Sequence, residues 1–84
     1  MKLYLLSQTD QNDYDTFDSC VVAAKNEDDA RMVHPYDKHF PTVNNWLDTN
    51  YTWANKPENV NVTLIGTAIK GTKRGVICSS FNAG

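Results

Sequence analysis

Residues 60–81 read VNVTLIGTAIKGTKRGVICSSF and hold two strand patterns separated by a polar turn. In the first pattern, apolar residues alternate with Asn61 and Thr63, as expected for a strand that buries one face. GVICSSF at 75–81 predicts a second strand. The connecting residues 70–75, KGTKRG, contain two glycines and predict the turn of a β-hairpin. This stretch therefore predicts half of a β-sheet.

A second pair of strands is predicted near the start of the chain. KLYLLSQ at 2–8 and FDSCVVAAK at 17–25 are both rich in apolar residues. Between them lies a cluster of Asp, Asn, Gln and Thr, which are residues typical of turns. We therefore expect another hairpin, with a loop over residues 9–16.

One short helix is predicted between the two strand pairs. Asn26 is a suitable N-cap, and the three acids that follow it suit the positive end of a helix dipole. Pro35 disfavours helical geometry at the residue before it, so the helix should run for about eight residues and place His34 at its C-terminal end. The 84 residues then form a single domain of the α+β class, in the order β-β-α-β-β. We expect a mostly antiparallel sheet with the helix on one face.

A long loop is predicted before the third strand, over residues 36–59. Its five aromatic residues show no clean period, and they serve either the core or a binding surface: Tyr36, Phe40, Trp46, Tyr51 and Trp53. A small domain with one short helix needs large side chains to cover its sheet, so we expect at least one tryptophan in the core. Trp46 and Trp53 are nevertheless candidate binding residues, because indole rings can stack on bases.

The two cysteines and the last phenylalanine lie in apolar runs. We predict that Cys20 and Cys78 are free, buried thiols. Alternation along the last strand predicts that Phe81 extends the apolar face of the sheet and covers the end of the core.

The composition excludes several classes of protein. Ten acids and eight bases give a net charge of −2, which argues against general nucleic-acid binding. No apolar run is long enough to span a membrane, and MKLYLLSQTD lacks a secretory signal, so we expect a cytoplasmic protein. The charges are unevenly spread, since eight acids lie within residues 10–37 and three bases lie within residues 70–74. Such a polarised molecule could orient a partner.

The acidic stretch 8–19, QTDQNDYDTFDS, does not match a calcium site. It contains no glycine, and its spacing does not fit the EF-hand loop. The basic residues of the 70–75 turn could bind phosphate groups. Outside the long loop, the candidate partner-binding residues are therefore the following: Asp13, Tyr14, Asp15, Phe17, Lys70, Lys73 and Arg74.

Motifs for catalysis are missing from the sequence. His34, Asp37 and His39 are close, but Pro35 separates the histidines and no fixed set of zinc ligands results. The chain has no nucleophile elbow, P-loop or dinucleotide fingerprint. We therefore predict a binding protein that is not an enzyme and has no cofactor or metal. Two alternatives stay open: a protein that sequesters a nucleotide signal, and a small metal- or thiol-dependent enzyme.

The segments MKLYLLSQ, YDTFDSCVVAAKNEDDARMVHP, PENVNVTLIGTA and RGVICSSFNAG resemble a group of small proteins encoded by tailed phages and prophages that end in a similar SFNAG tail. The resemblance covers most of the chain except residues 37–56. It carries no assigned activity and no catalytic residues. It implies a phage protein that acts in the host cytoplasm during infection. Such proteins often act by binding, either to inhibit a host defence or to redirect a host enzyme, and we expect an inhibitor that binds a host immune protein. Exposed strand edges also leave a homodimer open as an arrangement of the chain.

Overall fold

The computed structural model describes residues 1–41, 44–47 and 52–83. Its elements follow the chain in this order: β1 (Lys2–Ser7), β2 (Thr16–Ala24), α1 (Glu27–Arg31), η1 (Pro35–Lys38), η2 (Pro57–Asn59), β3 (Asn61–Thr67) and β4 (Gly75–Asn82), where η marks a 3-10 helix. The strands form one open antiparallel sheet, which confirms the predicted four-stranded sheet with few helical residues. No helix in these ranges is long and apolar enough to cross a membrane.

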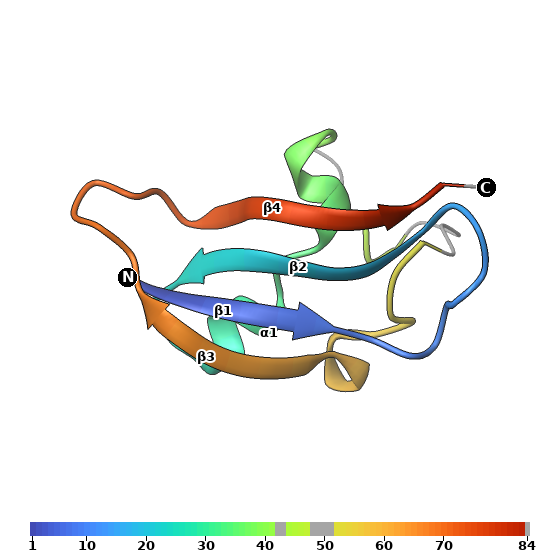
Figure 1. Cartoon of the computed structure of the whole chain (residues 1–84), viewed down its shortest axis with the longest axis horizontal. Coiled ribbons are helices and arrows are strands. Elements are labelled where there is room, and N and C mark those ends of the chain that lie inside the picture. Colours follow the sequence, from blue (N-terminus) through green and yellow to red (C-terminus); the bar gives the residue numbers. More distant parts are fainter. Residues whose placement is uncertain (42–43, 48–51, 84) are drawn as a thin grey trace.

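The strand order is β3-β1-β2-β4, so β3 and β4 occupy opposite edges of the sheet (Figure 1). The predicted hairpin within residues 60–81 is therefore wrong, whereas the β1–β2 hairpin is confirmed. Residues 68–74, here called the crossing loop, pass the ends of β1 and β2, and the Ala68 amide donates to the Met1 carbonyl. β3 pairs with β1 because β1 has apolar residues on both faces and suits the centre of a sheet better than an edge.

The core lies on one face of the sheet. Tyr4 and Leu6 of β1 face the same side as Cys20 and Val22 of β2, because these residues are direct cross-strand partners. Helix α1 lies against β1, β2 and β3 on that side, behind the sheet in Figure 1. The opposite, open face leaves Leu5 partly exposed. Ile65 and Ile77, which are the unpaired residues at the register shifts of β3 and β4, are also partly exposed.

The predicted helix is capped as expected but is shorter. The Asn26 side chain accepts a hydrogen bond of 2.8 Å from the Asp29 amide, which confirms the N-cap. The helix then ends at Arg31 after five residues. His34 is not a residue of its C-terminal end, as predicted, but the N-cap of η1. The Pro35 ring explains this change, because it starts a new helical turn in place of continuing the old one.

Two predictions about the last strand are wrong. Both cysteines are free, but only Cys20 is buried, whereas Cys78 is exposed. Phe81 is 44% exposed and so contributes less to the core than predicted. The physical reasons differ: Cys78 is on the open face of the sheet, whereas Phe81 is on the helix face of an edge strand, which has a neighbour on one side alone.

Candidate functional site

The 3-10 helix η1 is fixed by a reciprocal cap and lies against β4. The His34 Nδ1 atom accepts from the Tyr36 amide at 3.1 Å, and the Asp37 carboxylate accepts from the His34 amide at 2.9 Å. Because the cap uses His34 Nδ1 as an acceptor, this nitrogen carries no proton. The cap therefore needs a neutral imidazole.

Burial supports the neutral form of His34. The side chain is almost completely enclosed, and this desolvation lowers the pKa of His34 to about 4, although the nearby Asp37 carboxylate acts in the opposite direction. The imidazole meets the Trp46 ring edge-on, with 4.9 Å between the ring centres. His34 is thus a structural anchor for η1 at neutral pH.

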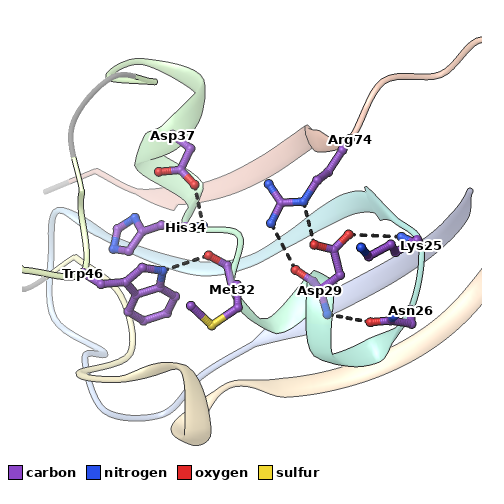
Figure 2. A network of polar contacts seen from close by, with 8 residues as sticks. All are labelled: Lys25, Asn26, Asp29, Met32, His34, Asp37, Trp46 and Arg74. Carbon is purple, nitrogen blue, oxygen red and sulfur yellow. Dashed lines mark hydrogen bonds and ion pairs between the residues drawn. The ribbon is translucent and has the colours of Figure 1, made fainter.

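The segment 44–47 is tied to the same cap (Figure 2). The Asn45 side-chain amide donates to Asp37 Oδ1 at 2.7 Å, and Trp46 Nε1 donates to the Met32 carbonyl at 2.9 Å. Trp46 is partly buried by these contacts. Its indole group lies between α1 and η1. The N–H donor of the ring is already used in the bond to the Met32 carbonyl.

Arg74 fastens the crossing loop to helix α1, as Figure 2 also shows. Its Nε atom donates to Asp29 Oδ1 at 2.8 Å, and a second nitrogen reaches the Asp29 carbonyl at 3.3 Å. Partial burial alone would raise the pKa of Asp29, but the hydrogen bonds from Arg74 and the Lys25 amide outweigh it and lower the pKa. The positive charge of Arg74 is therefore already neutralised within the chain.

These contacts enclose a polar cleft of about 610 Å³ between η1 and the start of β4. Arg74 and Trp46, two residues singled out from the sequence, both line it, together with Asp37 and Lys38. The structure thus brings a base and an aromatic residue of the predicted site together. The mixture of both charge signs, with Arg74 paired, gives this polar cleft no strong preference for an anion.

An apolar depression lies at the other end of η1. It has a volume of about 520 Å³ and is here called the aromatic groove, with this lining: Phe17, Tyr36, His39, Phe40, Ser79 and Phe81. The Phe17 ring is central, since it lies 4.8 Å from the Phe81 ring and 5.6 Å from the Tyr36 ring, in edge-on arrangements that favour aromatic pairing. Phe40 closes the outer side and is 54% exposed.

The remaining predicted residues are spread over both ends of the sheet. Asp13, Tyr14 and Asp15 are exposed in the β1–β2 loop, residues 8–15, where β2 begins and β4 ends. Lys70 and Lys73 are exposed in the crossing loop at the opposite end. These two sets therefore cannot form one site.

Two of the predicted aromatic residues belong to the core. Trp53 is 1% exposed, which confirms that one tryptophan is a core residue, and Phe17 is 3% exposed beneath the aromatic groove. Tyr51, a further aromatic residue of the long loop, lies outside the described residues. Of the four aromatic residues predicted as partner-binding, Tyr14 and Trp46 present surface for contact, whereas Phe17 and Trp53 do not.

The first half of the β1–β2 loop is held by the segment before β3. The Asp10 carboxylate accepts from the Asn55 amide at 3.0 Å and from the Asn59 side chain at 2.8 Å. These bonds lower the pKa of Asp10, the Asn55 bond most strongly. The carboxylate is thus engaged in structure, as expected for Asp in a turn.

Three residues of the aromatic groove were not among the predicted partner-binding residues: Tyr36 and Phe40, which were left open between core and binding surface, and His39, which was considered only as a zinc ligand. The available signal was the run PYDKHF, in which aromatic residues flank a proline-initiated turn. Nothing in the run shows that it packs on β4, because that contact depends on the strand order. The groove therefore became visible only with the fold.

Two observations on the described residues concern metal and thiol chemistry. No group of three or more His, Cys, Asp or Glu side chains among them could hold a metal ion. Burial is the main cause that raises the pKa of Cys20 to about 12, so this thiol stays protonated and is a poor nucleophile. In comparisons with known proteins, no family model, no curated protein and no solved structure matches the chain. Function is therefore inferred from the surface itself.

Proposed function

We propose that this chain is a binding protein without catalytic activity and that the aromatic groove is its contact surface for another protein. The observation that supports this most directly is the exposure of two aromatic rings around one open depression, Phe40 at 54% and Phe81 at 44%. Aromatic residues are enriched in the buried centres of protein interfaces, where they provide large contact areas.

The groove has the composition of an anchor site. Its lining is aromatic except for Ser79 and His39, which could orient a partner by hydrogen bonds. Phe17 forms a rigid floor, because it is buried and locked between two other rings. A partner could insert an apolar side chain into this largely preformed site. The groove residues would then lose little conformational freedom on binding.

The resemblance to phage-encoded proteins suggests which partner to test first. We propose a host immune protein that is inhibited by this binding in the host cytoplasm. No cofactor takes part in such a mechanism, because occlusion of a surface requires only complementary contact.

The test is affinity capture from host-cell extract, with binding to the isolated partner then measured by calorimetry. Phe40→Ala should weaken binding at least tenfold, as for an interface anchor. Ile69→Ala is the matched control, because Ile69 is an equally apolar, exposed residue on the crossing loop. If Tyr14→Ala abolishes binding while Phe40→Ala leaves it unchanged, the β1–β2 loop is the contact surface and the proposal for the groove is wrong.

A nucleotide ligand is the second candidate. The observation that favours it is the presence of Arg74 and Trp46 in one polar cleft. A base could stack on the indole group and a phosphate could compete with Asp29 for Arg74. Titration with nucleotides should then give saturable binding that Arg74→Met removes and Lys73→Met preserves. Absence of binding at millimolar nucleotide would reject this candidate.

A further inference from the structure

The two ends of the molecule carry opposite charge. Where β1 ends and β2 begins, the acids are Asp10, Asp13, Asp15 and Asp18, which outnumber the base Lys56 beside Asp10. Where β3 ends and β4 begins, the bases are Lys2, Lys25, Lys70, Lys73 and Arg74, which outnumber the acids Asp28 and Asp29 at the start of α1. Glu27 and Arg31 neutralise each other through an ion pair of 3.1 Å. The domain is 35 Å long, so these opposite charges are well separated along it.

In the described part of the chain, the outer edge of β4 has no paired strand, although η1 lies against β4 and projects beyond this edge in Figure 1. Residues 78–81 are all exposed, and none of the described segments pairs with this edge. The strand, GVICSSFN, contains no charged residue and no proline. Monomeric proteins usually protect an edge strand with such residues, because exposed backbone donors and acceptors recruit another strand.

We infer that β4 pairs antiparallel with β4 of a second copy and that the chain forms a symmetric dimer with a continuous eight-stranded sheet. The two-fold axis of such a dimer is perpendicular to the sheet, so the same surface is used by both copies. The inference is independent of the partner proposed above, because it rests on the strand edge and on the charge distribution.

The pairing keeps the two faces of β4 on the same sides of the sheet in both copies. Ser79 and Phe81 are partners of Cys20 and Phe17 and so lie on the helix face, whereas Cys78 and Ser80 lie on the open face. A two-fold axis at Ser80 places Ser79 opposite Phe81 of the second copy, with both residues on the helix face. The aromatic grooves of the two copies then lie side by side and expose one wider surface.

Charge complementarity favours the antiparallel arrangement. Antiparallel pairing at β4 places the acidic end of each copy beside β4 of the other and on the side of its basic crossing loop, whereas parallel pairing would bring like charges together. Lys70 and Lys73 are exposed, and neither has an ion-pair partner among the described residues. Their attraction to Asp13 and Asp15 of the second copy should be strongest at low salt, because charges are screened over about 8–10 Å at moderate salt.

The test is analytical ultracentrifugation of the full chain over micromolar concentrations. The wild type should sediment as a dimer, and Ser80→Lys should raise the dimer dissociation constant at least tenfold, because it places two lysines next to each other at the axis. Thr63→Lys is the matched control, since Thr63 is also exposed on the open face of an edge strand, β3. Circular dichroism should show that both variants remain folded.

A second measurement tests the charges. Lys70→Glu with Lys73→Glu should weaken the dimer, and the added changes Asp13→Lys and Asp15→Lys should restore it. A wild type that stays monomeric would overturn the inference, and so would a dimer that Thr63→Lys dissociates but Ser80→Lys does not. A dimer that Ser80→Lys dissociates but the charge reversals leave unchanged would overturn the antiparallel charge alignment.

Discussion

Strands β2 and β4 have similar compositions but very different environments. Each contains a phenylalanine, a cysteine, serine and valine, and the two strands are hydrogen-bonded neighbours. In β2 the phenyl ring and the thiol are buried, whereas in β4 both are exposed. The difference arises from position in the sheet. Phe17 belongs to a strand with a neighbour on each side and Phe81 to an edge strand. Cys20 is on the helix face, whereas Cys78 is on the open face. The burial of a residue in a small sheet therefore depends on its strand and its face more than on its own apolar character.

Replacement of the two phenylalanines should give the largest difference between the strands. Phe17→Ala removes the floor of the aromatic groove and should destabilise the fold by roughly 3–5 kcal/mol, the usual range for a buried phenyl ring. Phe81→Ala should cost roughly 1–2 kcal/mol, because much of that ring stays in water. Urea denaturation of both variants measures these values. Equal losses would show that β4 is buried as deeply as β2, for instance by a second copy.

The next largest effect should come from acid, which should weaken the packing of η1 against β2. Tyr36 of η1 lies against Phe17, and η1 depends on the neutral His34 cap. Since the folded-state pKa of His34 is about 4, below its ordinary value of 6.5, the unfolded chain binds the extra proton more readily. Stability is therefore full above pH 6.5 and falls as the pH drops towards 4, by up to roughly 3 kcal/mol.

Melting curves from pH 7 to pH 4 measure this dependence. His34→Asn keeps an acceptor near the Tyr36 amide and should remove most of the pH dependence of the melting temperature in that range. The remaining dependence should come from carboxylates that titrate near pH 4. His39→Gln is the control, because His39 is exposed. If His39→Gln flattens the curve and His34→Asn does not, the role given to the cap is wrong.

The two thiols should differ in their rate of chemical labelling. Cys78 on β4 should react with a maleimide reagent within minutes, while Cys20 on β2 should react at least about 100-fold more slowly, since its exposure needs opening of the core. Mass spectrometry of the folded chain should show one label, and denaturation should yield two. Rapid double labelling would contradict the assignment of β2 to the sheet interior.

The fold was predictable where local signals suffice. The β1–β2 hairpin follows from two apolar runs around a polar cluster, and the Asn26 cap follows from the acids after it. The strand order was not predictable in this way, because residues 70–75 have the composition of a hairpin turn although they belong to a crossover. Glycine and charged residues suit both kinds of connection, and the choice depends on the pairing of β3 with β1.

The candidate site was predictable only in part. Arg74 and Trp46 were selected for phosphate and aromatic chemistry, and the structure places them in one cleft. The aromatic groove was not predicted, because Tyr36 and Phe40 contact β4 through η1, a short turn without an apolar period. Phe17 was predicted for a surface, but the bulge around Asp18 and the position of β2 turn its ring inward.

The smallest effect is expected at the end where β2 begins and β4 ends. We predict that the β1–β2 loop has no specific calcium site. Calcium needs six to eight oxygen ligands, but Asp10 is engaged by two asparagines and the Asp13 carbonyl already accepts from Thr16 and Asn82. The exposed carboxylates of Asp13 and Asp15 alone should give only weak, diffuse attraction.

Calorimetric titration with calcium should therefore show no saturable heat below millimolar concentration, and the melting temperature should stay the same with and without the ion. Asp13→Asn should leave both results unchanged. This variant also serves as a check on the loop itself, because the backbone carbonyl that ties the loop to the end of β4 is retained. Saturable micromolar binding that disappears in Asp13→Asn would mean that the loop is a metal site. The acidic end of the sheet would then serve the ion instead of a positively charged partner.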